Sequence, residues 1–452
     1  MSIKDIGYLD FYGEKCVYIQ EDMNYILVPV NEGANIQRHF MEENYLLPFS
    51  SGVDKHCIAS VKRQIGSGLN SVCLNLNYIF KSLDDKEIDG FVLVGNEIDE
   101  FFSPLEYYFR LKRRNEYQSS DLLYGQDAVA QYHFTCEGIP IQIELVYGNV
   151  LREGIRTDLT VHPQLIVTFA GTKNTDFLFH VYSTIVRFLQ VVHRKTAYNL
   201  KNLQLFHNTE SGISYTGFMF GSLYNRDYRP SSRIDASFIY YGDKIGNMLS
   251  IIADEDAFPI RHLSLTGNNV YEYSTERLGA VSAAFEYEYG KTPIYPQKSN
   301  LFCPEAKRSI IDLIDKIQSD ETGFDQFKEL AKNNIGNLGT QPGLKSKIMS
   351  AYNTNFKALE SSLDFLLARH KSPEKAATCF VNLRGKVLHK ETGYVFNDFE
   401  TESIRFIEIL QYVMFLKRAK YTDQEIELLL GPLYYCNDVY MKHLLSDNGC
   451  EE

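Results

Sequence analysis

The residues best suited to chemistry lie near the end of the chain, where Arg384 and His389 are separated by four residues. A histidine, with an unperturbed pKa of about 6.5, can take a proton from a ribose 2′-hydroxyl at neutral pH. An arginine can donate two hydrogen bonds to a phosphate on which negative charge develops. Asn382, Lys386 and Lys390 add donors and positive charge beside this pair. The chemistry that these residue types permit is RNA cleavage without a metal ion, in which Arg384 and His389 would be the catalytic pair and Asn382, Lys386 and Lys390 would bind RNA phosphates.

The pair is predicted to lie at the end of a helix. Ser372 is placed to cap this helix and Pro373 to begin it. Residues five positions apart on a regular α-helix point about 140° apart around its axis. Arg384 and His389 therefore share a face only if the helix ends or bends between them, and Gly385 weakens the helix there. We expect a site at a helix end.

This segment resembles the HEPN domains, a family of nucleotide-binding helical bundles. Their ribonuclease members carry an arginine, four to six residues and then a histidine, and the stretch from Leu383 to His389 fits that spacing. The later apolar stretch from Ile409 to Leu416 looks like the family's next helix. More narrowly, the whole chain is similar to ApeA-like anti-phage proteins, in which a β-rich N-terminal region precedes a C-terminal HEPN domain.

The resemblance implies a role for each part of the chain. The C-terminal bundle forms a homodimer that brings two motifs together, RNA is the substrate, and the N-terminal region senses a phage-derived trigger or regulates cleavage. The chain is then an effector of abortive infection. One position departs from the family pattern, because a polar residue, often Asn, usually follows the arginine, and this chain has Gly385. Two alternatives stay open: a non-catalytic bundle that only dimerises, and a regulator that binds a nucleotide in the same pocket.

Composition places the chain among globular proteins. It has 452 residues, of which 44% are hydrophobic and 23% charged, a balance that excludes a disordered or collagen-like chain. The formal net charge of −12 argues against a protein that binds polyanions over its whole surface. A binding site for RNA must therefore be local.

The cysteines and apolar segments indicate a cytoplasmic protein. Eight cysteines are present without a Cys-x-x-Cys pair, which predicts reduced thiols and neither a metal site nor a disulfide framework. We expect no cofactor. No stretch reaches the roughly 18 uninterrupted apolar residues of a membrane span, so we expect no membrane partner.

The predicted fold class is α+β, with a β-rich and mixed N-terminal region followed by an all-α HEPN bundle. We divide the chain into a β-rich domain over residues 1–150, a mixed domain over 151–295 and the bundle over 296–452. Strands are expected at 16–20, 25–30, 90–94, 141–147, 165–169, 203–206 and 234–241. Helices are expected at 176–193, with Thr175 or Asp176 as cap, and at 276–289, 310–317, 359–367, 373–389, 404–416, 423–430 and 433–444.

Overall fold

The computed structural model describes most of the chain in two compact units, residues 1–259 and residues 260–452. The described residues are 4–31, 33–34, 36, 45–51, 54–68, 71–103, 129–150, 160–193, 203–210, 212–221, 238–255, 273–295, 304–337, 342–390 and 394–434. The first unit is built on a β-sheet and the second is helical.

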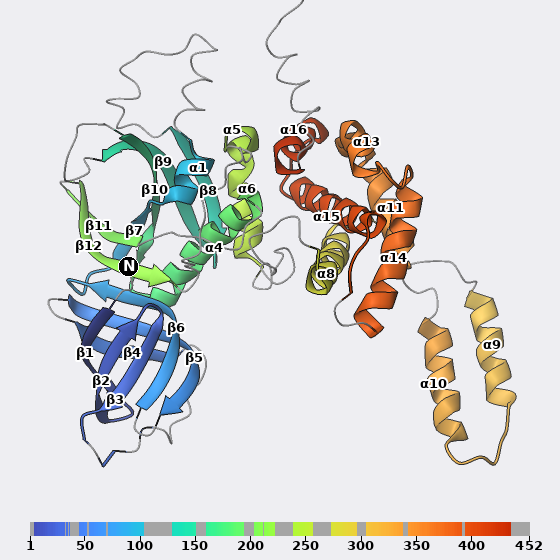
Figure 1. The fold of residues 1–452 in the computed structure, drawn as a ribbon, viewed down its shortest axis with the longest axis horizontal. Helices are drawn as coiled ribbons and strands as arrows, with labels where there is room; N and C mark the ends of the chain where they lie inside the picture. The colour runs from blue at the N-terminus through green and yellow to red at the C-terminus, as the bar shows by residue number, and fades with distance from the viewer. Residues whose placement is uncertain are drawn as a thin grey trace, which may run out of the picture. The chain divides into compact units, whose positions relative to one another are not determined.

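Six strands of the first unit close into a barrel, drawn in blue in Figure 1. They are β1 (Lys4–Phe11), β2 (Glu14–Glu21), β3 (Asn24–Pro29), β4 (Tyr45–Ser51), β5 (Asp54–Gly68) and β6 (Ser71–Ser82). Neighbours run antiparallel in the order β3-β2-β1-β4-β5-β6, and β3 pairs back with β6 to close the ring. Alternate side chains along β2 and β6 are buried, so one face of each strand supplies the barrel core.

Strand β6 also begins a second part of the sheet. Its first half pairs with β3, and its second half pairs with β12 from Tyr78 to Ser82. The sheet continues antiparallel in the order β12-β11-β7-β10-β9-β8. These strands are β7 (Ile88–Leu93), β8 (Ala130–Cys136), β9 (Ile139–Val150), β10 (Thr160–Thr172), β11 (Leu203–Thr209) and β12 (Gly212–Gly221).

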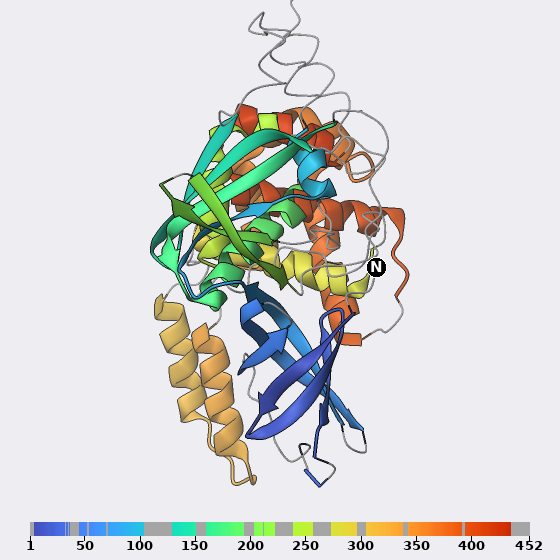
Figure 2. The same cartoon turned by 90° about the vertical axis from the view of Figure 1, so that its left-hand side faces the viewer.

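Helices α4 and α6 lie on one side of strands β7–β10 in Figure 1, and α4 lies behind those strands in Figure 2. The helices of this unit are α1 (Asn96–Phe101), α4 (Thr175–His193), α5 (Phe238–Tyr241) and α6 (Ile245–Ala253), with a 3-10 turn η2 (Gly242–Lys244). Most side chains of α4 are buried on every face, as expected for a helix enclosed by other elements. The Tyr78 hydroxyl donates to Asp176 at 2.7 Å and so links β6 to the first turn of α4.

The second unit contains only helices among the residues that the structure describes. They are α8 (Thr275–Lys291), α9 (Pro304–Lys316), α10 (Phe324–Asn337), α11 (Leu344–Thr354), α12 (Phe356–Leu359), η3 (Glu360–Ser362), α13 (Leu363–Leu366), α14 (Pro373–Lys390), α15 (Asp398–Arg418) and α16 (Asp423–Tyr434). Helix α15 is central, because it packs against α8, α11, α13, α14 and α16. Its start is fixed by a capping box in which Asn397 and Glu400 each accept the other's backbone N–H.

Two ion pairs fasten α8 to α15. Glu288 is fully buried and accepts two hydrogen bonds from Arg418, at 3.0 and 2.7 Å. Arg277 is only 2% exposed and pairs with Glu408 at 2.7 Å. Buried charges need such partners, so these pairs fix α8 within the helical unit.

The structure confirms the predicted α+β class, with a β-rich N-terminal region and a helical C-terminal region. The predicted boundaries near residues 150 and 295 stay predictions, as does the assignment of the bundle to the HEPN family. Within the described residues, no helix is long and apolar enough to cross a membrane.

Several local predictions were wrong. Asn174, not Thr175 or Asp176, caps α4, since its side chain accepts the N–H groups of Asp176 and Phe177. The segment expected as a strand at 234–241 is helical over its described part, α5, whose aromatic rings pack against those of Phe101 and Phe102.

Two predicted helices of the bundle also differ. The one at 359–367 is broken into α12, η3 and α13, in a stretch where Ser361 and Ser362 disfavour a regular helix. Beyond Tyr434, the helix predicted at 433–444 lies outside the described residues.

Candidate functional site

Helix α14 carries the predicted catalytic pair and runs without interruption from Pro373 to Lys390. The expected bend or end at Gly385 is therefore wrong, because the helix continues through that glycine to its last residue. Phe380, Leu383 and Val387 are buried and hold one face of α14 against the unit's core. The residues between these anchors lie toward the surface.

Arg384 is half-buried and reaches from α14 to α8. Its Nη2 lies 3.5 Å from Oε2 of Glu286, and 38% of its side chain is exposed. The other carboxylate oxygen of Glu286 lies 3.7 Å from the ammonium of Lys347 on α11. Glu286 thus lies between two cations, and the three side chains together carry a net positive charge.

One donor of the Arg384 guanidinium is unused. Its Nε is buried and has no hydrogen-bond partner among the described residues. A guanidinium has five N–H groups, and a single carboxylate at 3.5 Å satisfies few of them. The exposed part of the guanidinium therefore keeps the capacity to bind an anion, whereas the buried Nε is not accessible to one.

Lys386 is exposed and is held by the loop that follows α14. Its ammonium donates to the Tyr394 hydroxyl at 3.1 Å and lies 4.5 Å from the centre of that ring. The Tyr394 hydroxyl in turn donates to Glu400 at 2.6 Å. The other oxygen of Glu400 accepts the N–H of Asn397. The start of α15 thus positions a lysine of α14.

The remaining predicted residues are placed by the backbone of α14. Asn382 is exposed. His389 and Lys390 belong to the last turn of the helix, and their side chains lie outside the described part of the structure.

Regular helix geometry separates these positions around the axis. Position 384 lies about 140° from position 389, whereas position 386 lies only about 60° from it. On a regular helix, positions 384 and 389 therefore lie on different sides of α14.

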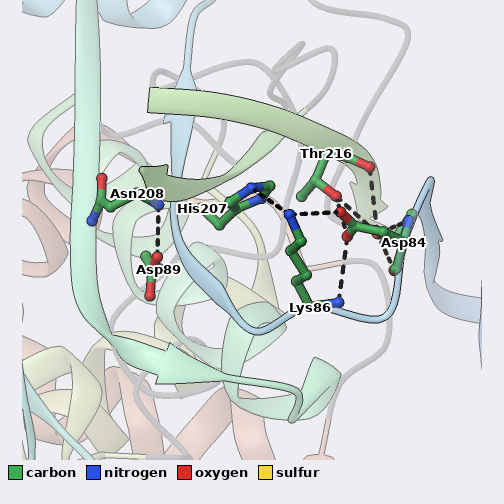
Figure 3. Close-up of polar contacts among 7 residues, drawn as sticks. Asp84, Lys86, Asp89, His207, Asn208 and Thr216 are labelled. Atoms are coloured by element: carbon green, nitrogen blue, oxygen red, sulfur yellow. Dashed lines mark hydrogen bonds and ion pairs between the residues drawn. The ribbon is translucent and has the colours of Figure 1, made fainter. Parts of the chain in front are cut away.

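A second polar cluster lies in the first unit, where the β6–β7 loop meets β11 and β12 (Figure 3). Lys86 extends between Asp84 and His207, with its ammonium 3.8 Å from the carboxylate and 3.3 Å from the ring Nε2. Thr216 donates to Asp84 at 2.7 Å, and Asp89 accepts the N–H of Asn208 at 2.7 Å.

This cluster has the chemistry of a structural link. The hydrogen bond from Thr216, together with the backbone of Lys86 and its charge, lowers the pKa of Asp84, so the carboxylate stays ionised and binds the loop to β12. His207 is nine-tenths buried, and its Nδ1 has no partner among the described residues. We assign no catalysis to the cluster.

Sequence reasoning missed Glu286 and Lys347, which stand beside Arg384 only after folding. Both are ordinary charged residues on helices far from position 384 in the sequence, and no motif marks them. The acidic stretch from Asp84 to Asp89 can be recognised in the sequence, but nothing in the sequence indicates that His207 lies beside it. Within the described ranges, no three His, Cys, Asp or Glu side chains are placed to hold a metal ion.

Comparison with known proteins adds no assignment to this geometry. No family model matches the chain, and neither a curated protein nor a solved structure matches it.

Proposed function

We propose that the chain is a HEPN-type endoribonuclease that acts as an anti-phage effector. The proposal rests on the Arg384-to-His389 motif and on its position in the last two turns of a surface helix within a helical unit. The observation that carries it is the partly exposed guanidinium of Arg384, which lies in a cluster of net positive charge with Glu286 and Lys347. Such a group is suited to a phosphate.

The reaction follows from the chemistry of the two groups. His389 takes the proton of a ribose 2′-hydroxyl, and the 2′-oxygen attacks the adjacent phosphorus. The bond to the 5′-oxygen breaks, a 2′,3′-cyclic phosphate forms, and the departing 5′-oxygen takes the proton that His389 had accepted. Arg384 donates hydrogen bonds to the phosphoryl oxygens as negative charge builds on them. Asn382, Lys386 and Lys390 bind the neighbouring RNA backbone.

The site is composed of two chains related by a two-fold axis. Positions 384 and 389 point to different sides of one helix, so the arginine of one chain acts with the histidine of its partner. The N-terminal unit senses a phage-derived trigger or restrains the nuclease. This last assignment rests on the resemblance stated above and on the size of that unit.

Cleavage of labelled RNA by the purified full chain tests the proposal. Arg384→Ala and His389→Ala are each expected to lose about 100-fold or more in rate. Arg308→Ala, at an exposed arginine of α9, is the matched control and should cleave normally. An all-DNA analogue should stay intact because it lacks the attacking hydroxyl. Wild-type protein that cleaves no RNA, or two active-site variants that cleave like wild type, would contradict the assignment.

Mixing the two inactive variants tests the composite site. A heterodimer of Arg384→Ala and His389→Ala keeps one complete site, so the mixture should recover about a quarter of wild-type activity if chains exchange freely. A site within one chain predicts no recovery. The control is the Arg384→Ala variant alone at the same total concentration.

A further inference from the structure

Helices α9 and α10 form a hairpin. They lie side by side in Figures 1 and 2 and pack against each other. Lys332 of α10 pairs with Asp315 of α9 at 2.6 Å, and Lys328 donates to the backbone oxygens of Asp315 and Ile317. These bonds fix the register of the two helices.

One face of the hairpin is apolar and exposed. Ile310 and Leu313 lie on α9, and Ile317 follows its last residue at the same helical spacing; 46%, 61% and 53% of these residues are exposed. Phe327 and Leu330 form the matching row on α10 and are 65% and 62% exposed. On an antiparallel helical hairpin, both rows fall on the same side of the plane that contains the two axes.

The hairpin has no core of its own. None of its residues whose side chains the structure describes is buried, and helices of 13 and 14 residues are marginal in water without a packed apolar face. Five large side chains that each expose about 100 Å² present roughly 500 Å², at the upper end of what a monomer leaves uncovered. The face therefore needs an occupant.

We propose that this face binds the same face of a second copy of the chain and forms an intermolecular four-helix bundle. Two copies together bury roughly 1,000 Å², which reaches the size of a specific interface. The apolar rows of α9 and α10 have the residue spacing of a coiled-coil seam. A two-fold axis can therefore place the two rows of one chain against the same two rows of a second chain. This inference does not depend on the proposed nuclease.

The charges of the hairpin favour a second copy over other occupants. Residues 304–337 contain seven acidic and five basic side chains, a net charge of −2. This segment offers no basic surface for nucleic acid or for an anionic membrane. Interspersed charges of both signs around an apolar centre are instead typical of helix-to-helix association.

Sedimentation of the full chain over a range of concentrations tests the interface. The double variant Leu313→Glu/Leu330→Glu should weaken the association step made by the hairpin at least tenfold, because it places four carboxylates in the centre of the intermolecular bundle, and should leave the dimer proposed at α14 unchanged. The control Lys316→Glu/Asn333→Glu adds the same residues at exposed positions away from the apolar rows and should associate like wild type. Circular dichroism must show the same helix content in all three proteins.

Hydrogen exchange of residues 304–337 separates the possible occupants. Protection in wild type should rise with protein concentration and be lost in the Leu313→Glu/Leu330→Glu variant. Protection that does not depend on concentration would mean that another part of the same chain covers the face, and it would overturn the proposal. Unchanged association of the double variant, or a wild-type chain without any concentration-dependent association, would overturn it as well.

Discussion

Gly385 leaves room for the polar residue that HEPN ribonucleases usually have after the arginine. A Cβ atom added at this glycine meets no atom within 4 Å, and the helix continues through it. Gly385→Asn should therefore raise the rate of RNA cleavage while stabilising the fold by about 0.3 kcal/mol through helix propensity. Gly385→Ala is the control for helix stability alone. An equal rise in rate for both variants would assign the gain to the helix and not to the amide.

Tyr394 positions Lys386 through its hydroxyl and its ring. Tyr394→Phe keeps the ring beneath the ammonium but removes the bonds to Lys386 and Glu400. We expect KM for RNA to rise a few-fold with kcat little changed, since a phosphate-binding lysine acts in substrate binding. Tyr394→Ala should raise KM further. The comparison of both constants in steady-state assays checks the prediction, and a loss confined to kcat would contradict it.

Two buried thiols of the first unit should be inert at neutral pH. Burial raises the pKa of Cys16 to about 11 and that of Cys136 to about 12, with nearby carboxylates adding to each shift. Both should resist iodoacetamide at pH 8 until the protein is denatured, as mass spectrometry of the labelled peptides would show.

Unfolded thiols ionise above a pH of about 8.5 while the folded ones stay protonated, so the urea midpoint should fall as pH rises from 8 to 10.

At the scale of elements, the attachment of α8 to α15 depends on a buried charge. Glu288→Ala leaves Arg418 without its bidentate partner and should lower the free energy of unfolding by about 3 kcal/mol. The matched control lies two residues away, where Glu286 is about one-third exposed and Glu286→Ala should cost under about 1 kcal/mol. Denaturant titration of both variants measures the difference. Equal losses would mean that the buried pair does not stabilise the helical unit.

Elements with a strong local pattern could be predicted from the sequence. The helices α4, α14 and α15 and the hairpin of β8 and β9 follow from apolar periodicity and turn residues. The aromatic and β-branched residues of segment 238–241 predict a strand, but in the structure the segment is helical and Tyr241 packs against Phe101 of α1. Tertiary contacts decided that element, and a local pattern does not contain them.

The candidate site shows the same limit. The motif on α14 could be read directly, and so could the nearby lysines. The carboxylate beside Arg384 could not be predicted from the sequence, because Glu286 lies near Arg384 only when α8 packs in the helical unit. The closed ring of six strands was also missed, since closure depends on β3 pairing with β6 across a long stretch of sequence.

At the scale of the whole molecule, the two units should separate by truncation. A fragment of residues 260–452 retains α8 with both of its ion pairs to α15 and should fold cooperatively on its own. A fragment that begins at residue 296 lacks α8 and therefore lacks Arg277 and Glu288. Their partners on α15, Glu408 and Arg418, then lose these ion pairs. We expect it to melt at lower temperature or to aggregate. Thermal unfolding followed by circular dichroism compares the two, and equal stability would show that α8 is dispensable.

Closure of the barrel also limits where this protein can aggregate. Because β3 pairs with both β2 and β6, the barrel presents no open edge, and within the described residues the twelve-stranded sheet ends at β8 alone. Helix α6 approaches that strand so closely that a Cβ at Gly246 would meet the carbonyl oxygen of His133. Growth of an intermolecular sheet from this end of the described sheet, the first step toward an amyloid-like deposit, would therefore begin at the seven residues Ala130–Cys136 and be opposed by the helix packed against them.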